Sequence, residues 1–112
     1  AVVWGAGIRA SPAAQWLGIA PDRAGRIPVS ARLEVEGLPD IYALGDTAAA
    51  PGADGAPLPG LAQVAKQQGE HLGRALARQA ERGEPPAPFA FRNRGNTAII
   101  GRHAAVFDFG KR

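Results

Sequence analysis

The amino-acid sequence predicts an α/β fold in which one long helix packs with short strands; as an isolated piece, the chain would form an α+β unit. Three observations support this prediction. Residues 61–82 repeat apolar side chains at helical spacing. Residues 26–36 alternate apolar and polar side chains, which is the period of a half-buried strand pair. Residues 41–44 are all apolar, as in a strand buried in a parallel sheet.

The N-terminal part of the chain combines a strand-like run with a short helix. Residues 1–4 are apolar and too few for a helix, so we expect a buried strand there. Ser11 and Pro12 are residue types preferred at a helix N-cap and at the first helical position, and Gly18 is a typical terminator. We therefore expect a helix of about two turns, followed by a turn in the sequence PDRAG.

The alternating segment places apolar and polar side chains on opposite faces. Its apolar face consists of Ile27, Val29, Ala31, Leu33 and Val35. The sequence GLPD ends the alternation before the apolar run of residues 41–44. Residues 48–59 are rich in Gly, Pro and Ala, so they are predicted to form a loop.

The long helix is predicted to run from Leu61 to about Arg82. Gly83 ends it, and the sequence EPPAP prevents it from resuming. Two strand-like runs follow, residues 97–101 and 104–109, which form either a hairpin or one bent strand. The apolar stripe of the helix is expected to contain Leu61, Ala65, Leu72, Ala75 and Leu76.

Composition and charge narrow the possible functions. The net charge is +3 with no block of like charges, so a nucleic-acid partner is not expected. The chain has no cysteine, which excludes disulfides and thiolate chemistry, and His71 and His103 are too far apart in sequence to suggest a metal site. No apolar run reaches the roughly 18 residues that span a bilayer. Because Met is absent and both ends are strand-like, we expect a soluble fragment of a longer protein, with a small processed domain as the alternative.

The sequence GAGIRA formally matches the G-x-G-x-x-G/A fingerprint of dinucleotide binding. In that fingerprint the helix starts within the motif, so that its N-terminal amides face a pyrophosphate. Here Ser11 and Pro12 start the helix after the motif, and the helix is too short to lead back to a parallel strand. We therefore interpret Gly5 and Gly7 as a tight turn where the chain crosses between domains.

The sequence YALGD has two interpretations that the residues alone leave open. Gly45 and Asp46 can simply end a strand and start a turn. Alternatively, because ligands of open α/β sheets bind beyond the carboxyl ends of strands, Gly45 would allow a ligand to approach closely. Asp46 would then accept hydrogen bonds from ribose-like hydroxyl groups.

The first turns of the long helix carry a polar stripe beside the apolar one. Gln63, Gln67 and His71 recur every four residues, and this face is either solvated or contacts a ligand. Small residues near the helix start, including Gly60 and Ala62, would let a flat group lie against it. The free N–H groups and partial positive charge of the helix N-terminus can stabilise negative charge on such a group.

These motifs together resemble flavoproteins with two dinucleotide-binding domains, and among them the type II NADH dehydrogenases (NADH:quinone oxidoreductases). The resemblance is carried by VVWGAGIRASPAAQWLG, GRIPVSARLEVEGLPDIYALGD, LPGLAQVAKQQG and RNRGNTAIIGRHAAVFDFG, which cover nearly all of the chain. YALGD marks only the superfamily, whereas AQVAKQQG is the specific part. The resemblance implies that residues 1–20 end the NADH-binding domain and cross over, and that residues 21–112 are the C-terminal part of a partial FAD-binding domain.

The resemblance also implies roles for individual residues. Asp46 would bind the ribityl hydroxyls of FAD, with Gly45 allowing contact. The backbone of Ala62 and Gln63 would face the pyrimidine edge of the isoalloxazine, where the helix dipole would favour the anionic reduced flavin. Gly5 and Gly7 would lie where nicotinamide and flavin meet. The quinone pocket would be bordered by Gln63, Lys66 and Gln67. No residue of this chain would be catalytic by itself, and no metal is implied.

The complete enzyme would pass a hydride from NADH to FAD and then two electrons to quinone. It would lie on the cytoplasmic side of the inner membrane, as a peripheral protein of the respiratory chain held by segments beyond Arg112. The isolated chain is expected to be inactive and to bind FAD weakly. Its unpaired strand edges would favour dimerisation or strand exchange, and a homodimer is one expected form.

Two alternatives remain at this point. One is another reductase of the same superfamily, such as a ferredoxin reductase or a sulfide:quinone reductase; the lack of cysteine argues against the sulfide enzyme. The other is a free-standing binding module with a basic helix face formed by Arg74, Arg78 and Arg82, whose partner would be nucleic acid or anionic lipid.

Overall fold

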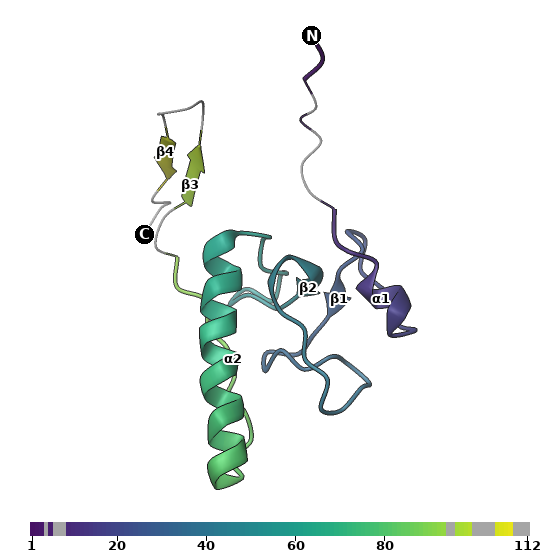
Figure 1. Ribbon diagram of the computed structural model, residues 1–112, viewed down its shortest axis with the longest axis vertical. Helices are drawn as coiled ribbons and strands as arrows, with labels where there is room; N and C mark the ends of the chain where they lie inside the picture. Colours follow the sequence, from purple (N-terminus) through teal and green to yellow (C-terminus); the bar gives the residue numbers. More distant parts are fainter. Residues whose placement is uncertain (4, 6–8, 94–95, 100–104, 109–112) are drawn as a thin grey trace.

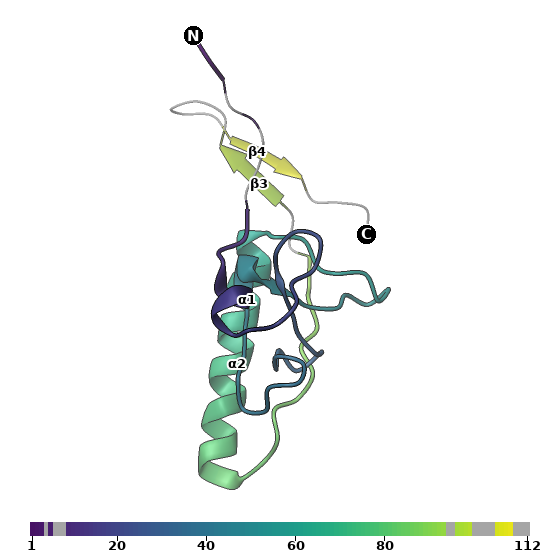
Figure 2. The same cartoon turned by 90° about the vertical axis from the view of Figure 1, so that its right-hand side faces the viewer.

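A computed structural model describes residues 1–3, 5, 9–93, 96–99 and 105–108 of the protein. Helix α2 stands along one side of a loop-rich layer formed by residues 9–60 (Figures 1 and 2). The predicted α/β combination of one long helix and short strands is confirmed. In chain order the elements are α1 (Ala13–Trp16), β1 (Ile27–Pro28), the 3-10 turn η1 (Gly45–Thr47), β2 (Ala48–Ala49), α2 (Ala62–Arg82), β3 (Asn96–Ile99) and β4 (Ala105–Asp108).

The parallel pairing expected from the sequence is present, but with a different second strand. β1 pairs in parallel with β2, with Ile27 opposite Ala48. The prediction of a buried parallel strand at residues 41–44 is wrong, because this segment is only partly buried and Tyr42 makes an isolated antiparallel bridge with Glu34. The turn η1 then redirects the chain, so that residues 48–49, predicted as loop, pass beside β1.

The alternating segment folds back on itself as a tight hairpin. Val29 bridges Val35 in antiparallel fashion, and the amide of Ser30 donates a 2.9 Å hydrogen bond to the carbonyl of Glu34. The predicted apolar face is buried except at Ala31, which is exposed because it lies in the turn of the hairpin. The alternation therefore predicted burial correctly at four of its five apolar positions, which are Ile27, Val29, Leu33 and Val35.

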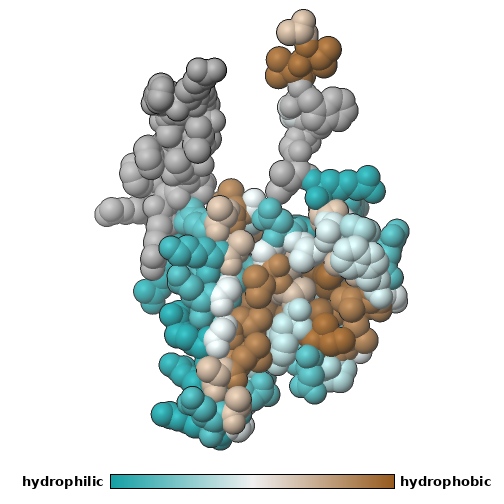
Figure 3. All heavy atoms as spheres, viewed as in Figure 1, coloured by the Kyte–Doolittle hydropathy of each residue, from teal (hydrophilic) through white to brown (hydrophobic). Residues whose placement is uncertain are grey.

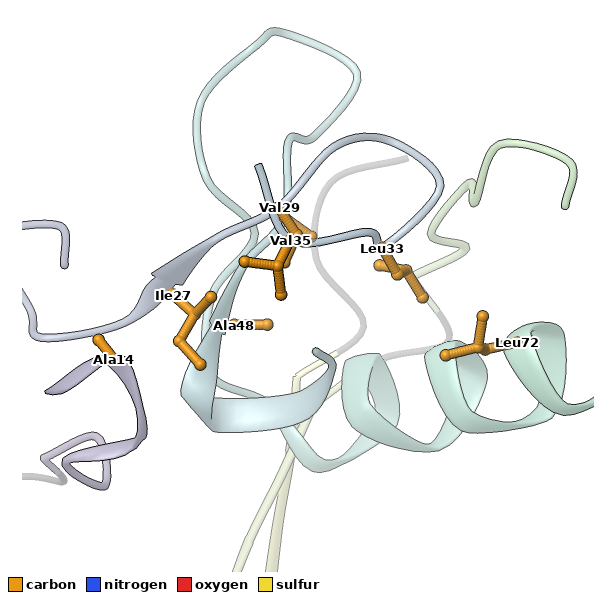
Figure 4. Close-up of a cluster of buried hydrophobic side chains, with 8 residues drawn as sticks. Ala14, Ile27, Val29, Leu33, Val35, Ala48 and Leu72 are labelled. Atoms are coloured by element: carbon orange, nitrogen blue, oxygen red, sulfur yellow. The ribbon is translucent and has the colours of Figure 1, made fainter. Parts of the chain in front are cut away.

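The hydrophobic core lies where α1, the strand pair, the hairpin and α2 meet (Figure 4). α1 contributes Ala14, β2 contributes Ala48, and α2 contributes Leu72. Leu33 is 0% exposed although its φ of 66° lies in the left-handed region, which side chains rarely adopt. Its packing therefore outweighs a local backbone cost.

Helix α1 is shorter than the sequence predicts. It starts after Pro12, which takes the N-cap position, and no side chain caps it. The prediction of Ser11 as N-cap is thus wrong; its hydroxyl instead lies 3.2 Å from the hydroxyl of Thr47. Gly18, with φ of 68°, ends the helix as predicted.

The predicted N-terminal strand is absent from residues 1–3. Val2 and Val3 are each 93% exposed and pair with no strand in the described part of the chain. A strand needs such a partner for its N–H and C=O groups, which explains why an apolar run alone did not form one. The remaining residue of the predicted strand, Trp4, lies outside the described residues.

Helix α2 has nearly the predicted bounds and ends at Gly83, whose φ is 69°. Figure 3 shows hydrophobic residues on the side of α2 that faces the loop-rich layer and hydrophilic residues on the other side. The predicted stripe is right for Leu72 and Ala75, whereas Leu76 stays 37% exposed. No helix among the described residues is both long and apolar enough to cross a membrane. The buried face of α2 consists of Val64, Gln68, Leu72 and Ala75.

The C-terminal strands form a hairpin, which was one of the two predicted arrangements. β3 and β4 pair antiparallel, with Asn96 opposite Asp108 and Ile99 opposite Ala105. Residues 100–104, which connect the two strands, lie outside the described part of the chain.

The segment after α2, residues 84–93, returns along the helix and is held by the polar stripe. Gln67 makes two hydrogen bonds with the backbone of Arg92: its Nε2 donates to the carbonyl at 2.8 Å, and its Oε1 accepts from the amide at 3.0 Å. One turn further, His71 Nε2 lies 2.8 Å from the carbonyl of Ala87, and its ring meets that of Phe89 edge-on. The stripe is therefore occupied by the chain's own backbone.

We predict that Leu33→Ala lowers the free energy of unfolding by about 2–5 kcal/mol, because it removes a fully buried side chain from the core. Urea denaturation followed by circular dichroism measures the change. Leu76→Ala is the control and should cost less than about 1 kcal/mol, since Leu76 is partly exposed. Equal losses in the two variants would contradict the placement of the core.

We predict that Gln67→Leu loosens the returning segment at Arg92, because both hydrogen bonds to the backbone of Arg92 are lost while the amide of Phe89 stays bonded to the carbonyl of Ala31. The expected result is faster hydrogen exchange of the Arg92 amide, followed in the peptide that contains it, with a change in global stability of about 1–3 kcal/mol. Lys66→Ala, at the exposed neighbouring position, should leave exchange in this segment unchanged. Exchange that is equally slow in Gln67→Leu would show that other contacts hold the segment.

Candidate functional site

The candidate site is centred on η1, the turn that carries Asp46. Its first residue, Gly45, has φ of 76°, a conformation that glycine adopts without strain. The amide of Gly45 donates a 2.8 Å hydrogen bond to Oε1 of Gln68 on α2. A Cβ placed on Gly45 would lie 3.6 Å from the Cβ of Ala65, so the turn runs close against the helix. The predicted glycine is thus required by the backbone at this point.

Asp46 presents its carboxylate on the surface. The residue is exposed, and within the described residues its carboxylate takes part in no hydrogen bond or ion pair. An ionised carboxylate has two oxygens that can accept hydrogen bonds from hydroxyl groups. Its chemistry and position therefore suit the predicted role toward a polyol.

The buried side chain of Gln68, which accepts the hydrogen bond from Gly45, was not predicted from the sequence. Gln68 is 1% exposed and is the buried polar residue of the described core. It lies one helical turn from each of the buried apolar residues Val64 and Leu72. A glutamine in step with the buried stripe is the signal that would have identified it, because a buried amide needs a polar partner.

Two sequence motifs that are far apart in the chain meet at η1. The hydroxyls of Ser11 and Thr47 lie 3.2 Å apart, which brings the segment after GAGIRA beside the aspartate turn. Among the described residues other than its chain neighbours, nothing lies within 4 Å of a Cβ placed on Gly5. Gly7 lies outside the described residues. The structure thus places the residue that follows GAGIRA beside the turn that ends the YALGD motif. It does not describe the predicted crossing between domains.

The start of α2 lies next to this turn. Leu61 is at the N-cap position without a side-chain hydrogen bond, and the first turn contains no acidic residue. The N–H groups at Ala62 and Gln63 belong to the first helical turn, where the macrodipole places partial positive charge. This helix end therefore favours a negatively charged or electron-rich group.

The predicted quinone-side residues occupy one face of α2 but differ in their surroundings. Lys66 is exposed. Gln67 is hydrogen-bonded to Arg92, and Nε2 of Gln63 lies 3.5 Å from Oδ1 of Asn93. The two glutamines therefore face the returning segment, and Lys66 faces solvent.

Three clefts in the described structure lie away from Asp46. One cleft of about 540 Å³ is lined by residues around α1. Another, of about 500 Å³, lies between the hairpin of residues 29–35 and the prolines that follow α2. A smaller cleft of about 260 Å³ lies between α2 and the returning segment. Asp46 lines none of the three, so it stands on an open surface. No group of three histidine or acidic side chains in the described residues is placed to hold a metal ion.

Comparison with known proteins agrees with the sequence motifs. A type II NADH:quinone oxidoreductase from Mycobacterium tuberculosis, NdhA, is 36% identical over 97% of this chain and 24% of its own length. A type II NADH:quinone oxidoreductase from Staphylococcus saprophyticus is 37% identical over 94% of this chain and 26% of its own length. A mitochondrial internal alternative NAD(P)H-ubiquinone oxidoreductase from Solanum tuberosum is 34% identical over 96% of this chain and 24% of its own length.

These relatives confirm the resemblance to type II NADH:quinone oxidoreductases and disfavour a free-standing binding module. The chain spans about a quarter of the length of the relatives that it matches. Residues 1–69, which include both glycine motifs and the first turns of α2, match the family model of the pyridine nucleotide-disulphide oxidoreductases. The chain therefore belongs to the pyridine nucleotide-disulphide oxidoreductase family.

Proposed function

We propose that this chain is part of an FAD-dependent NADH:quinone oxidoreductase and contributes the aspartate turn and the start of α2 to its flavin site. One observation carries the proposal: the hydrogen bond from Gly45 to Gln68 holds the Asp46 turn beside the first turns of α2. The similarity of nearly the whole chain to NADH:quinone oxidoreductases supports this assignment.

The residues at η1 fit a flavin nucleotide. Asp46 would accept hydrogen bonds from the ribityl hydroxyls, because its carboxylate is exposed and makes no competing bond in the described residues. The backbone N–H groups at Ala62 and Gln63 would face the polar edge of the flavin ring, where the helix dipole favours negative charge. When bound, FAD would take a hydride from NADH and deliver two electrons to quinone.

The polar face of α2 would border the quinone. Lys66 is the exposed cationic group on this face and would contact the quinone directly. Gln67 would act mainly through the returning segment, since both ends of its amide are bonded to Arg92. Gln63 would contribute to both the flavin and the quinone side. A location at the membrane surface and a homodimer stay predictions of this proposal.

We predict that Asp46→Asn in the full-length protein weakens FAD binding by about tenfold or more, because charge-assisted hydrogen bonds to the ribityl hydroxyls are lost. The dissociation constant of FAD is measured by fluorescence titration of the apoprotein. The matched control is Asp54→Asn, in an exposed loop, which keeps an Oδ1 acceptor for the amide of Ala56 and should bind FAD as the unmodified protein does.

Three results would contradict the proposed function. The first is full-length protein that binds no FAD, and the second is unchanged FAD affinity in Asp46→Asn. The third is an equal loss of affinity in Asp54→Asn, which would show that surface charge rather than the site is responsible.

A further inference from the structure

We propose that Gln68 is a positioning residue for the flavin site: it couples the Asp46 turn to α2, so that both parts keep one relative geometry. This inference rests on the proposed function, because it concerns the same FAD site. It assigns a role to a residue that contacts neither flavin nor quinone in that proposal.

Gln68 is placed where an apolar side chain would be expected. It is 1% exposed and lies between Val64 and Leu72 on the buried face of α2. Burying an amide is unfavourable unless the amide finds hydrogen-bond partners. The partner of Oε1 is the amide of Gly45, at 2.8 Å, so the side chain serves the turn.

The turn needs this acceptor. The first N–H groups of a helical turn have no partner within the turn itself, and the N-cap residue Leu44 makes no side-chain hydrogen bond to η1. Glycine also populates many backbone conformations, and the observed φ of 76° at Gly45 is one of them. A fixed acceptor on α2 selects this conformation. Asp46 follows directly, and the direction of its carboxylate depends on that selection.

The hydrogen bond also fixes the distance between the turn and the helix start. Gly45 lies against Ala65, which is less than one turn from Gln68. On its other side the turn is tied through Thr47 to Ser11. A shift of α2 along its axis would therefore move Gly45, and the ribityl-side and ring-side parts of the site would move together.

Hydrogen exchange tests the coupling without reference to any ligand. In the full-length protein, Gln68→Met removes the acceptor but keeps the length and burial of the side chain. We expect the amide of Gly45, followed in the peptide that contains it, to exchange at least tenfold faster. Gln79→Met, about three turns further along α2, is the control and should leave this peptide unchanged. Unchanged exchange in Gln68→Met would overturn the inference.

Flavin affinity tests whether the coupling serves the site. We expect Gln68→Met to raise the dissociation constant of FAD by about tenfold. Gln68→Leu, which also removes the acceptor and places an apolar side chain at this buried position, should raise the dissociation constant to a similar extent. Leu72→Ala, which leaves the contact with Gly45 intact, should lower the melting temperature but leave the dissociation constant within about twofold of that of the unmodified protein.

The outcomes separate positioning from simple stability. FAD affinity that is unchanged in Gln68→Met or Gln68→Leu, or lost equally in Leu72→Ala, would overturn a positioning role. If the unmodified protein binds no FAD, the proposed function fails. The exchange of Gly45 would then still decide whether Gln68 holds the turn.

Discussion

The hydrogen bond between the amide of Gly45 and the side chain of Gln68 links the loop-rich layer of residues 9–60 to helix α2. On one side of it, the left-handed glycine redirects the chain from the Tyr42 bridge into β2, which pairs with β1. On the other side, α2 delivers Leu72 to the same core. Strands β1 and β2 have only two residues each, so their pairing depends on contacts with α2 and with the hairpin of residues 29–35. The site inherits its geometry from this arrangement, because Asp46 sits within the linking turn.

The site therefore consists of surfaces that the fold presents rather than a cavity that it encloses. An exposed carboxylate and an uncapped helix N-terminus are both polar features that would be costly in a core but are favourable toward a polar ligand. Their proximity is the structural basis of the proposal that this chain contributes to a flavin site. The neighbouring face of α2 is more constrained, since its glutamines already hold the returning segment.

Local patterns in the sequence predicted the elements whose formation depends on local physics. The bounds of α2, its end at Gly83 and the buried positions of the hairpin follow from helical spacing, a left-handed terminator and alternation. The strand at residues 48–49 was not predictable in this way, because two alanines carry no strand pattern and their partner strand β1 lies far away in the sequence. The burial of Gln68 was not predicted for a related reason, since it depends on a hydrogen bond to a backbone amide that is far away in the sequence. The left-handed glycine at position 45 and the turn at Asp46 could be predicted because their motif is short and contiguous, whereas the role of Asp46 toward a ligand stays a prediction.

The way in which Gln67 holds the returning segment has a consequence for how this stretch can vary. Both of its hydrogen bonds go to the backbone of Arg92, and His71 likewise faces a backbone carbonyl. The side chain at position 92 is therefore free to differ among natural variants without loss of the attachment. Proline is the exception, because it has no amide hydrogen to donate. Natural sequences should therefore vary in charge and size at position 92 while avoiding proline there, whereas Phe89, which packs against the core, should vary less.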